Sequence, residues 1–326
     1  MATYFAAGLS ALTLTFLAGL ICIPVLRKMK AGQPILKYVK THEMKNGTPT
    51  MGGLFFILPL SAVFFAFNGL SSRIATVSVA IGLFYMFIGF LDDFLKIKLK
   101  HNEGLKPYQK IIFQTAIAFL AGAFAFMNGL SVIYIPFVKT TVDIGYFVIF
   151  AVAFIFIAIT NSVNLTDGLD GLAGSVSVFY AIFIVAIISL EKGFGAQYLK
   201  ADEYNGISLL SFALIGAIIG FLIFNVPKAK VFMGDTGSLS LGAFLGALSS
   251  FSGNILFIPI LGAAFVWSSL SVIIQVVHFK RTKKRVFLMA PFHHHLQMKG
   301  LSETQISFYY SVFTVITGTV SVIFYL

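Results

Sequence analysis

The sequence is divided into ten apolar stretches, most of them long enough to cross a lipid bilayer as a helix. About 20 apolar residues span the hydrocarbon core. The chain as a whole is 58% hydrophobic and 11% charged, with a mean hydropathy of +0.93, which is typical of an integral membrane protein and excludes a soluble globular domain. The stretches cover residues 4–26, 51–68, 73–95, 111–127, 145–163, 172–190, 207–224, 238–251, 255–278 and 304–325, with 238–251 the shortest. We therefore predict an all-α polytopic membrane protein of about ten transmembrane helices, built as one domain over residues 1–326.

The basic residues lie on alternate connections between these stretches. The connections 27–50, 96–110, 225–237 and 279–303 hold 19 of the 23 Lys and Arg residues. Because cytoplasmic loops are enriched in Lys and Arg, this set is predicted to be cytoplasmic. An even number of helices then places both termini outside the cytoplasm. The net charge of +11 is explained by this orientation and by anionic lipid headgroups, so it does not indicate a nucleic-acid partner.

Five aspartates are the unusual residues in so apolar a chain. Asp92 and Asp93 end one stretch, Asp167 and Asp170 lie in NLTDGLDGLAG, and Asp235 lies in FMGDTGSL. A carboxylate at the bilayer centre costs about 2.5–3.5 kcal/mol, so these groups are expected at helix ends, where they can converge on one site that faces water. With the segment 164–171, the four basic connections are predicted to form this site on the cytoplasmic face.

The residue types around these aspartates indicate phosphoryl-transfer chemistry. Carboxylate oxygens, water and phosphate are the ligands that Mg²⁺ prefers. The basic residues Lys45, Lys96 and Lys110 add charge that suits phosphates, and the glycines of the two short loops allow a ligand to approach the backbone. Together they favour metal-assisted transfer of a phosphoryl group. Each feature also has a simpler explanation, since Asp235 could only cap a helix, the glycines could pack helices and the basic loops could only set topology.

The connection 279–303 contains three consecutive histidines, His293, His294 and His295, after Pro291 and Phe292. Adjacent side chains rarely all face one metal ion. Imidazoles that titrate near neutral pH suit hydrogen bonds to sugar, carboxylate or phosphate groups.

Five motifs in this order resemble the polyprenyl-phosphate N-acetylhexosamine-1-phosphate transferase superfamily. They are GTPTMGG (47–53), the Asp pair 92–93, NLTDGLDGLAG (164–174), FMGDTGSL (232–239) and PFHHHL (291–296). The resemblance is greatest to the bacterial cell-wall branch, the phospho-N-acetylmuramoyl-pentapeptide transferases. One departure is Gln297, where the family commonly has Glu after the histidines, so this position carries no charge here.

The resemblance implies a reaction, a cofactor and partners. Phospho-MurNAc-pentapeptide would pass from UDP-MurNAc-pentapeptide to undecaprenyl phosphate, giving lipid I and UMP in peptidoglycan synthesis, with Mg²⁺. A homodimer in the bacterial inner (plasma) membrane is also implied. The sequence leaves open whether the lipid phosphate attacks directly or through an aspartyl-phosphate intermediate.

The resemblance also implies roles for individual residues. Asp235 would be the metal ligand, Asp92 a base or charge organiser near the lipid phosphate, and Asp93 its partner. The uridine would stack on Phe232. The remaining assignments follow the same motifs. The uracil edge would be read by Asp170 and the backbone of Leu165 and Gly168, and phosphates would be met by Lys96 and Lys110. The cleft would be lined by Lys45, Asn164, Asp167 and Asn225, and the sugar-peptide portion would be recognised by His293, His294 and His295, with His293 also counted among the catalytic residues beside Asp92, Asp93 and Asp235.

Two other functions remain open from sequence. A sister enzyme could use UDP-GlcNAc, although PFHHHL argues against it because sister enzymes differ in this loop. A proton- or cation-coupled transporter could also carry an acidic cluster, but its acids would tend to lie near the bilayer midplane.

Overall fold

A computed structural model describes residues 1–29, 47–68, 70–99, 104–193 and 199–326; the side chains of 191–193 are not described. Helices dominate it, as the sequence predicts. The elements in chain order are α1 (Ala2–Lys28), α2 (Leu54–Asn68), α3 (Arg73–Leu99), α4 (Pro107–Met127), β1 (Val132–Ile135), β2 (Thr140–Asp143), α5 (Phe147–Thr166), α6 (Leu172–Gly193), α7 (Ala201–Asn225), α8 (Gly234–Phe251), the 3₁₀ helix η2 (Ile255–Phe257), α9 (Ile258–Leu261), α10 (Ala263–Thr282), α11 (Phe292–Met298) and α12 (Glu303–Tyr325).

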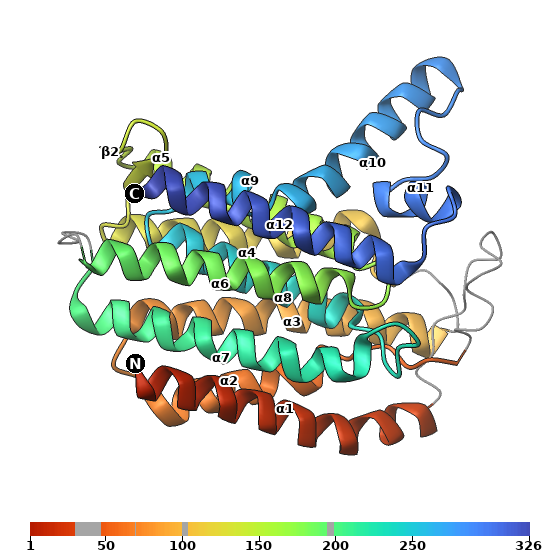
Figure 1. Cartoon of the computed structure of the whole chain (residues 1–326), viewed down its shortest axis with the longest axis horizontal. Helices are drawn as coiled ribbons and strands as arrows, with labels where there is room; N and C mark the ends of the chain where they lie inside the picture. The colour runs from red at the N-terminus through yellow and green to blue at the C-terminus, as the bar shows by residue number, and fades with distance from the viewer. Residues whose placement is uncertain (30–46, 69, 100–103, 194–198) are drawn as a thin grey trace.

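The long helices run side by side in a bundle, with both chain termini at one end (Figure 1). Among the described residues, eight helices are long and apolar enough to cross a membrane, and α2 is a shorter apolar helix. A helix satisfies its own backbone hydrogen bonds, which a segment surrounded by lipid requires. All ten predicted stretches contain helix, so the predicted fold class is confirmed. Which side of the membrane the termini face stays a prediction from the basic residues.

The centre of the bundle is α8, which is the stretch that hydropathy marks least clearly. Every residue from Thr236 to Phe251 is buried. Its sequence is rich in Gly, Ala and Ser, and small side chains let neighbouring membrane helices approach closely. Because α3 and α5 pack against α8, the acidic residues at the ends of these helices are brought together.

The prediction of a single helix over 255–278 is wrong. The segment is broken into η2, α9 and α10, with the last break at Gly262. After this break α10 leaves the bundle at an angle (Figure 1), and only Ala264, Phe265, Ser268 and Ser271 of α10 are buried.

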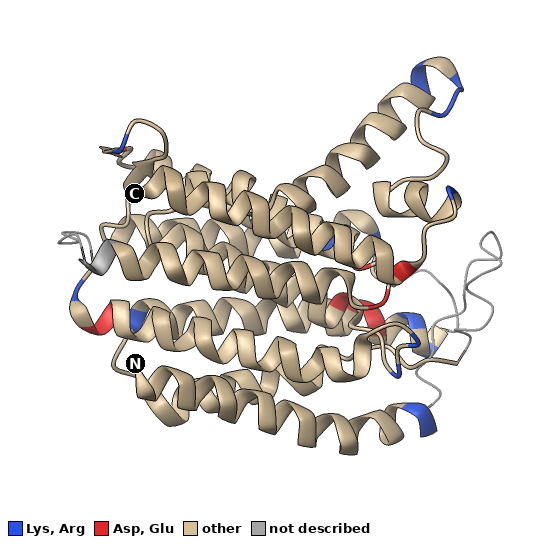
Figure 2. Ribbon diagram, viewed as in Figure 1, with Lys and Arg blue, Asp and Glu red and all other residues tan. Residues whose placement is uncertain are grey.

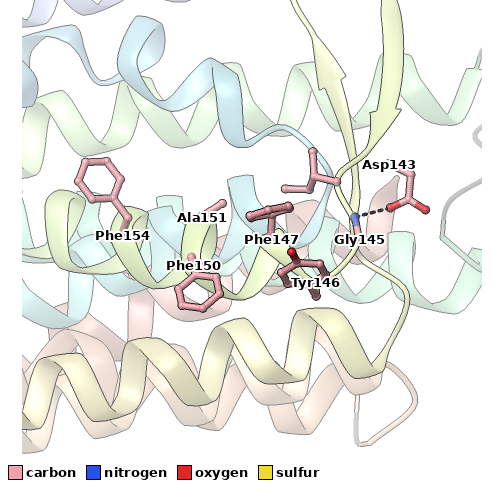
Figure 3. Close-up of a pocket in the computed structure, with 8 residues that line it drawn as sticks. Asp143, Gly145, Tyr146, Phe147, Phe150, Ala151 and Phe154 are labelled. Carbon is pink, nitrogen blue, oxygen red and sulfur yellow. Dashed lines mark hydrogen bonds between the residues drawn. The ribbon is translucent and has the colours of Figure 1, made fainter.

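The end of the bundle that carries the termini also holds a β-hairpin that the hydropathy pattern did not predict. Strands β1 and β2 pair antiparallel, with Val132 opposite Asp143 and Ile135 opposite Thr140. Their Val, Ile and Thr residues favour extended backbone. Beside the hairpin, an apolar pocket of about 820 Å³ lies along exposed aromatic side chains of α5, including Phe147 and Phe150 (Figure 3).

Candidate active site

Three of the five aspartates meet at the end of the bundle opposite the termini. Asp92 and Asp93 lie near the end of α3, and Asp235 lies in the first turn of α8. Oxygens of the three carboxylates all lie within 4.8 Å of one another. Figure 2 shows acidic residues gathered at this end, with Lys and Arg around them. The packing of α3 on α8 therefore brings together two motifs that are more than 140 residues apart in the sequence.

Two lysines neutralise much of this negative charge. Lys96 lies one helical turn after Asp92, and its Nζ is 2.6 Å from Asp92 Oδ2 and 3.1 Å from Asp235 Oδ2. Lys110 of α4 reaches the same Asp235 oxygen at 2.6 Å. Both lysines are helical, because α3 continues to Leu99 and α4 begins at Pro107, so the predicted loop 96–110 is shorter than expected. Three carboxylates and two ammonium groups leave one net negative charge.

The other oxygen of Asp235 is held by α5. Asn164 Nδ2 donates to Asp235 Oδ1 at 2.7 Å and to Ser238 Oγ at 2.8 Å. Asp235 is therefore fixed by side chains from α3, α4 and α5. Ser238 was not predicted from sequence, although its position three residues after Asp235, on the same helix face, was a usable signal.

Asp93 has a different environment from Asp92. It is fully buried, and its Oδ2 accepts hydrogen bonds from the Thr236 backbone N–H at 3.0 Å and from Thr236 Oγ1 at 2.7 Å. The Asp235 N–H donates to its Oδ1 at 3.3 Å. The carboxylate thus caps the first turn of α8, where unpaired N–H groups favour a negative charge. At the preceding Gly234, φ is +70°, and an added Cβ would collide with Asp93 Oδ2.

The donor set of this cluster fits a divalent cation. Asp92 and Asp235 offer carboxylate oxygens, which are hard ligands of the kind Mg²⁺ prefers. Asp93 uses its oxygens on the α8 N-terminus and is less available as a ligand. A bound cation of charge +2 would turn the net charge of the cluster positive and would suit anionic phosphates.

Asp170 and Asn225 join the loops beside this cluster. Asp170 is buried, and its Oδ2 accepts from the backbone N–H groups of Lys228 and Ala229 at 3.1 and 3.0 Å. Asn225 accepts from the Gly171 N–H at 3.1 Å and donates to the Val231 carbonyl at 2.9 Å. These bonds hold the 167–171 and 226–233 loops together. Glu303, which the sequence did not mark, adds a bond from the Asp170 N–H at 3.1 Å.

Phe232 is half-buried within the 226–233 loop, two residues before α8 begins at Gly234. Its backbone is fixed by the 47–53 motif, because its N–H donates to the Pro49 carbonyl at 2.8 Å and its carbonyl accepts from the Gly52 N–H at 2.9 Å. Leu165 lies in the last turn of α5 and Gly168 just after it. The motif at 47–53 thus positions Phe232, one of the predicted uridine-binding residues. The predicted Lys45 lies outside the described residues.

The three histidines have unequal surroundings on α11. His293 is fully buried and packs against Gly168, and neither of its ring nitrogens has a hydrogen-bond partner among the described residues. His295 Nδ1 accepts from the Leu288 N–H at 3.1 Å, so it braces the preceding loop. His294 Nδ1 lies 3.2 Å from Gln297 Oε1.

Burial changes the ionisation of two of the predicted residues. Burial, and then the neighbouring His294, lowers the pKa of His293 well below its ordinary value, so this imidazole is neutral. Burial, and then the negative charges of Asp235, Asp93 and Asp170, raises the pKa of Asp167 well above its ordinary value. Asp167, the C-cap residue of α5, is therefore harder to ionise than an exposed aspartate.

Comparison with known proteins places this geometry in a family. The model of glycosyl transferase family 4 matches residues 75–253, which contain the three clustered aspartates. The phospho-N-acetylmuramoyl-pentapeptide-transferase signature 1 matches residues 45–57.

Curated relatives agree over almost the whole chain. A phospho-N-acetylmuramoyl-pentapeptide-transferase of Clostridioides difficile (strain 630) is 41% identical over 97% of this chain and 96% of its own length. The chain belongs to the phospho-N-acetylmuramoyl-pentapeptide-transferase family. Further members with the same name, from Desulfitobacterium hafniense and Clostridium perfringens (strain SM101), are 39% and 42% identical over 99% and 91% of this chain and 97% and 89% of their own lengths. The family resemblance seen in the motifs is thus confirmed.

Proposed function

We propose that the chain transfers phospho-MurNAc-pentapeptide from UDP-MurNAc-pentapeptide to undecaprenyl phosphate, releasing UMP and forming lipid I for peptidoglycan synthesis. The observation that carries this proposal is the convergence of Asp92, Asp235, Lys96, Lys110 and Asn164 from four helices at one end of a membrane bundle. A lipid acceptor and a nucleotide donor can both reach such a site, since it lies where the helices end. The names of the relatives support this transferase and neither a UDP-GlcNAc enzyme nor a transporter.

Mg²⁺ is proposed as the cofactor, held by Asp235 with Asp92 beside it. When bound, the ion would neutralise charge on the donor pyrophosphate. The chain's own residues would orient the reactants: Lys96 and Lys110 bring ammonium donors to the phosphates, and Asn164 keeps Asp235 in place. Because a dianionic lipid phosphate needs little deprotonation, Asp92 would mainly orient it by charge, as electrostatic preorganisation requires.

The uridine is proposed to bind at Phe232, beside the 47–53 and 226–233 segments, which are paired through their backbones. The aromatic ring would stack on uracil, with the backbone of Leu165 and Gly168 nearby. In this arrangement Asp170 and Asn225 shape the pocket by holding its loops. Of the three histidines, His294 is the one placed beside Gln297 on the half-buried face of α11, and we assign the muramyl-peptide portion to this loop.

The protein is further proposed to act as a homodimer in the bacterial plasma membrane, with this site on the cytoplasmic face. The excess of Lys and Arg at the site end of the bundle supports the orientation (Figure 2). No nucleic acid is expected as a partner.

The deciding experiment is reconstitution of the purified protein with undecaprenyl phosphate, Mg²⁺ and either UDP-MurNAc-pentapeptide or UDP-GlcNAc, with UMP release as the readout. We expect UMP only from the muramyl donor and none after chelation. The variant Asp235→Asn keeps the size of the side chain but removes its charge, so its turnover should fall by at least about a hundredfold. UMP release from UDP-GlcNAc alone, or near-normal turnover of Asp235→Asn at limiting Mg²⁺, would overturn the proposal.

A further inference from the structure

A second polar group lies inside the bundle, deeper than the acidic cluster. The Gln114 side chain of α4 is fully buried, and its Oε1 accepts a hydrogen bond from Asn161 Nδ2 of α5 at 2.7 Å. The Tyr85 hydroxyl of α3, also fully buried, donates to the Gln114 backbone carbonyl at 3.1 Å. These three residues, which we call the Gln114 node, join the three helices that supply the side chains around Asp235.

The spacing along each helix aligns the Gln114 node with the site. On α4, Lys110 is one turn before Gln114, and on α5, Asn164 is one turn after Asn161. On α3, Asp92 is seven residues, or two turns, after Tyr85. Residues at these intervals lie on the same face of a helix. Each member of the node therefore lies one or two turns farther into the bundle than a side chain that belongs to the acidic cluster or contacts it.

The node also carries an energetic cost that apolar residues would avoid. Gln114 Nε2 is buried with no hydrogen-bond partner in the described structure. Between membrane helices, small and apolar side chains pack without such a penalty. A helix pair held only by apolar contacts can slide, whereas an amide-to-amide bond has one register.

We propose that the Gln114 node is a positioning device for the transfer reaction, which fixes the relative height of α3, α4 and α5. Its effect is to hold Lys110 and Asn164 on the two opposite oxygens of Asp235. This inference rests on the proposed site, because it explains how Lys110 and Asn164 of that site are held against Asp235. In this proposal the node residues act through Lys110 and Asn164 and do not themselves bind the substrates.

The test compares variants that remove one bond of the node and keep its volume. Gln114→Met removes the amide, Asn161→Leu removes the donor, and Tyr85→Phe removes only the hydroxyl. Since misplacing reacting groups by about 1 Å can cost on the order of a hundredfold, we expect kcat to fall roughly 10- to 100-fold in the first two variants and less in the third. KM for the UDP-linked donor should change less than about threefold, because uridine contacts lie elsewhere.

The matched control is Tyr180→Phe. The Tyr180 hydroxyl makes a buried bond of 2.7 Å to Ser249 Oγ between α6 and α8, and Ser249 is roughly 20 Å along α8 from Asp235. This variant loses a buried interhelical bond far from the site, so we expect its melting temperature to fall while kcat is kept. The double variant Gln114→Asn/Asn161→Gln keeps both amide groups and the combined length of the two side chains. It should therefore keep most of the turnover.

Three outcomes separate the inference from the proposed site. Loss of kcat in Gln114→Met and Asn161→Leu beyond that of Tyr180→Phe, with KM kept, supports the node. Equal kcat values in node and control variants, with turnover abolished in Lys110→Met, would overturn the node and leave the proposed site standing. Normal turnover in both Lys110→Met and Asp235→Asn would overturn the site itself, and the node with it.

Discussion

Replacing Asp93 by Asn should destabilise the protein as well as inactivate it. The Asp93 carboxylate accepts three hydrogen bonds from the first turn of α8. An Asn side chain has one acceptor oxygen, and its NH₂ group would face a backbone N–H of Asp235 or Thr236. The variant therefore loses at least one bond outright and weakens the others by removing their charge.

The magnitude follows from these bonds. Hydrogen bonds to a charged acceptor contribute about 1.5–3 kcal/mol and neutral ones about 1 kcal/mol. One lost bond and two weakened bonds would cost on the order of 4 kcal/mol, from which about 1–2 kcal/mol is recovered because a buried negative charge near Asp92 and Asp235 disappears. We expect the free energy of unfolding to fall by about 2–3 kcal/mol, and turnover by at least about a hundredfold because Asp235 moves with the turn.

The assay is thermal unfolding of the purified protein, measured beside UMP release. Two variants serve as references. Asp92→Asn should lose turnover while the hydrogen bonds to the first turn of α8 stay intact, and Thr236→Val should lose about 1.5–3 kcal/mol of stability through the missing hydroxyl. If Asp93→Asn is as stable as the unchanged protein and yet inactive, the capping argument fails, because the carboxylate would then act directly in the chemistry.

Three further predictions concern ligand binding, ionisation and topology. Phe232→Ala should raise KM for the UDP-linked donor roughly 5- to 150-fold, since a stacked base is worth about 1–3 kcal/mol; an effect confined to the lipid acceptor in initial-rate measurements would contradict this. Because the pKa of His293 is lowered in the folded protein, the unfolded chain binds one proton more as the pH falls below about 6.5, so stability is lost on acidification by up to about 1.4 kcal/mol per pH unit. Melting temperatures at about pH 7.5 and 5.5 should differ less in His293→Gln, and an unchanged difference would show that another group titrates. In a variant without the single native cysteine, a membrane-impermeant thiol reagent should label Lys200→Cys and not Lys283→Cys in intact cells; the reverse pattern would invert the topology.

Much of the fold was predictable because lipid imposes a simple rule on the sequence. Segments of about 20 apolar residues must be helical, and the ten predicted stretches contain helix. The break at Gly262 was not visible, because apolar residues continue across it and hydropathy does not distinguish one helix from two at an angle. The hairpin at 132–143 escaped for a different reason, since it lies in a connection and its two strands of 4 residues each are too short for a hydropathy pattern to mark.

The candidate site was predictable at the level of motifs and less so for single residues. The aspartates and lysines that meet around Asp235 were marked by their charge in an apolar chain, and Asn164 was marked by the family resemblance of its motif. The hydrogen bonds that support the site were harder to predict, because they join segments far apart in the sequence. They are the bonds that Asp93 accepts from Thr236, that Asp170 accepts from the 228–229 backbone, and that Glu303 accepts from the Asp170 N–H. Gln114 and Asn161 lie within apolar stretches, where one amide gives no pattern.

The composition of α8 has a consequence for how the molecule is assembled during synthesis. Its Gly, Ala and Ser residues are enclosed by other helices and have little affinity for lipid, so α8 would partition weakly into a bilayer by itself. Its neighbours α3 and α5 leave the ribosome earlier and can form a niche before α8 arrives. Asp235 is thereby carried to its partners only when most of the bundle already exists, which makes completion of the reactive centre a late event in membrane insertion.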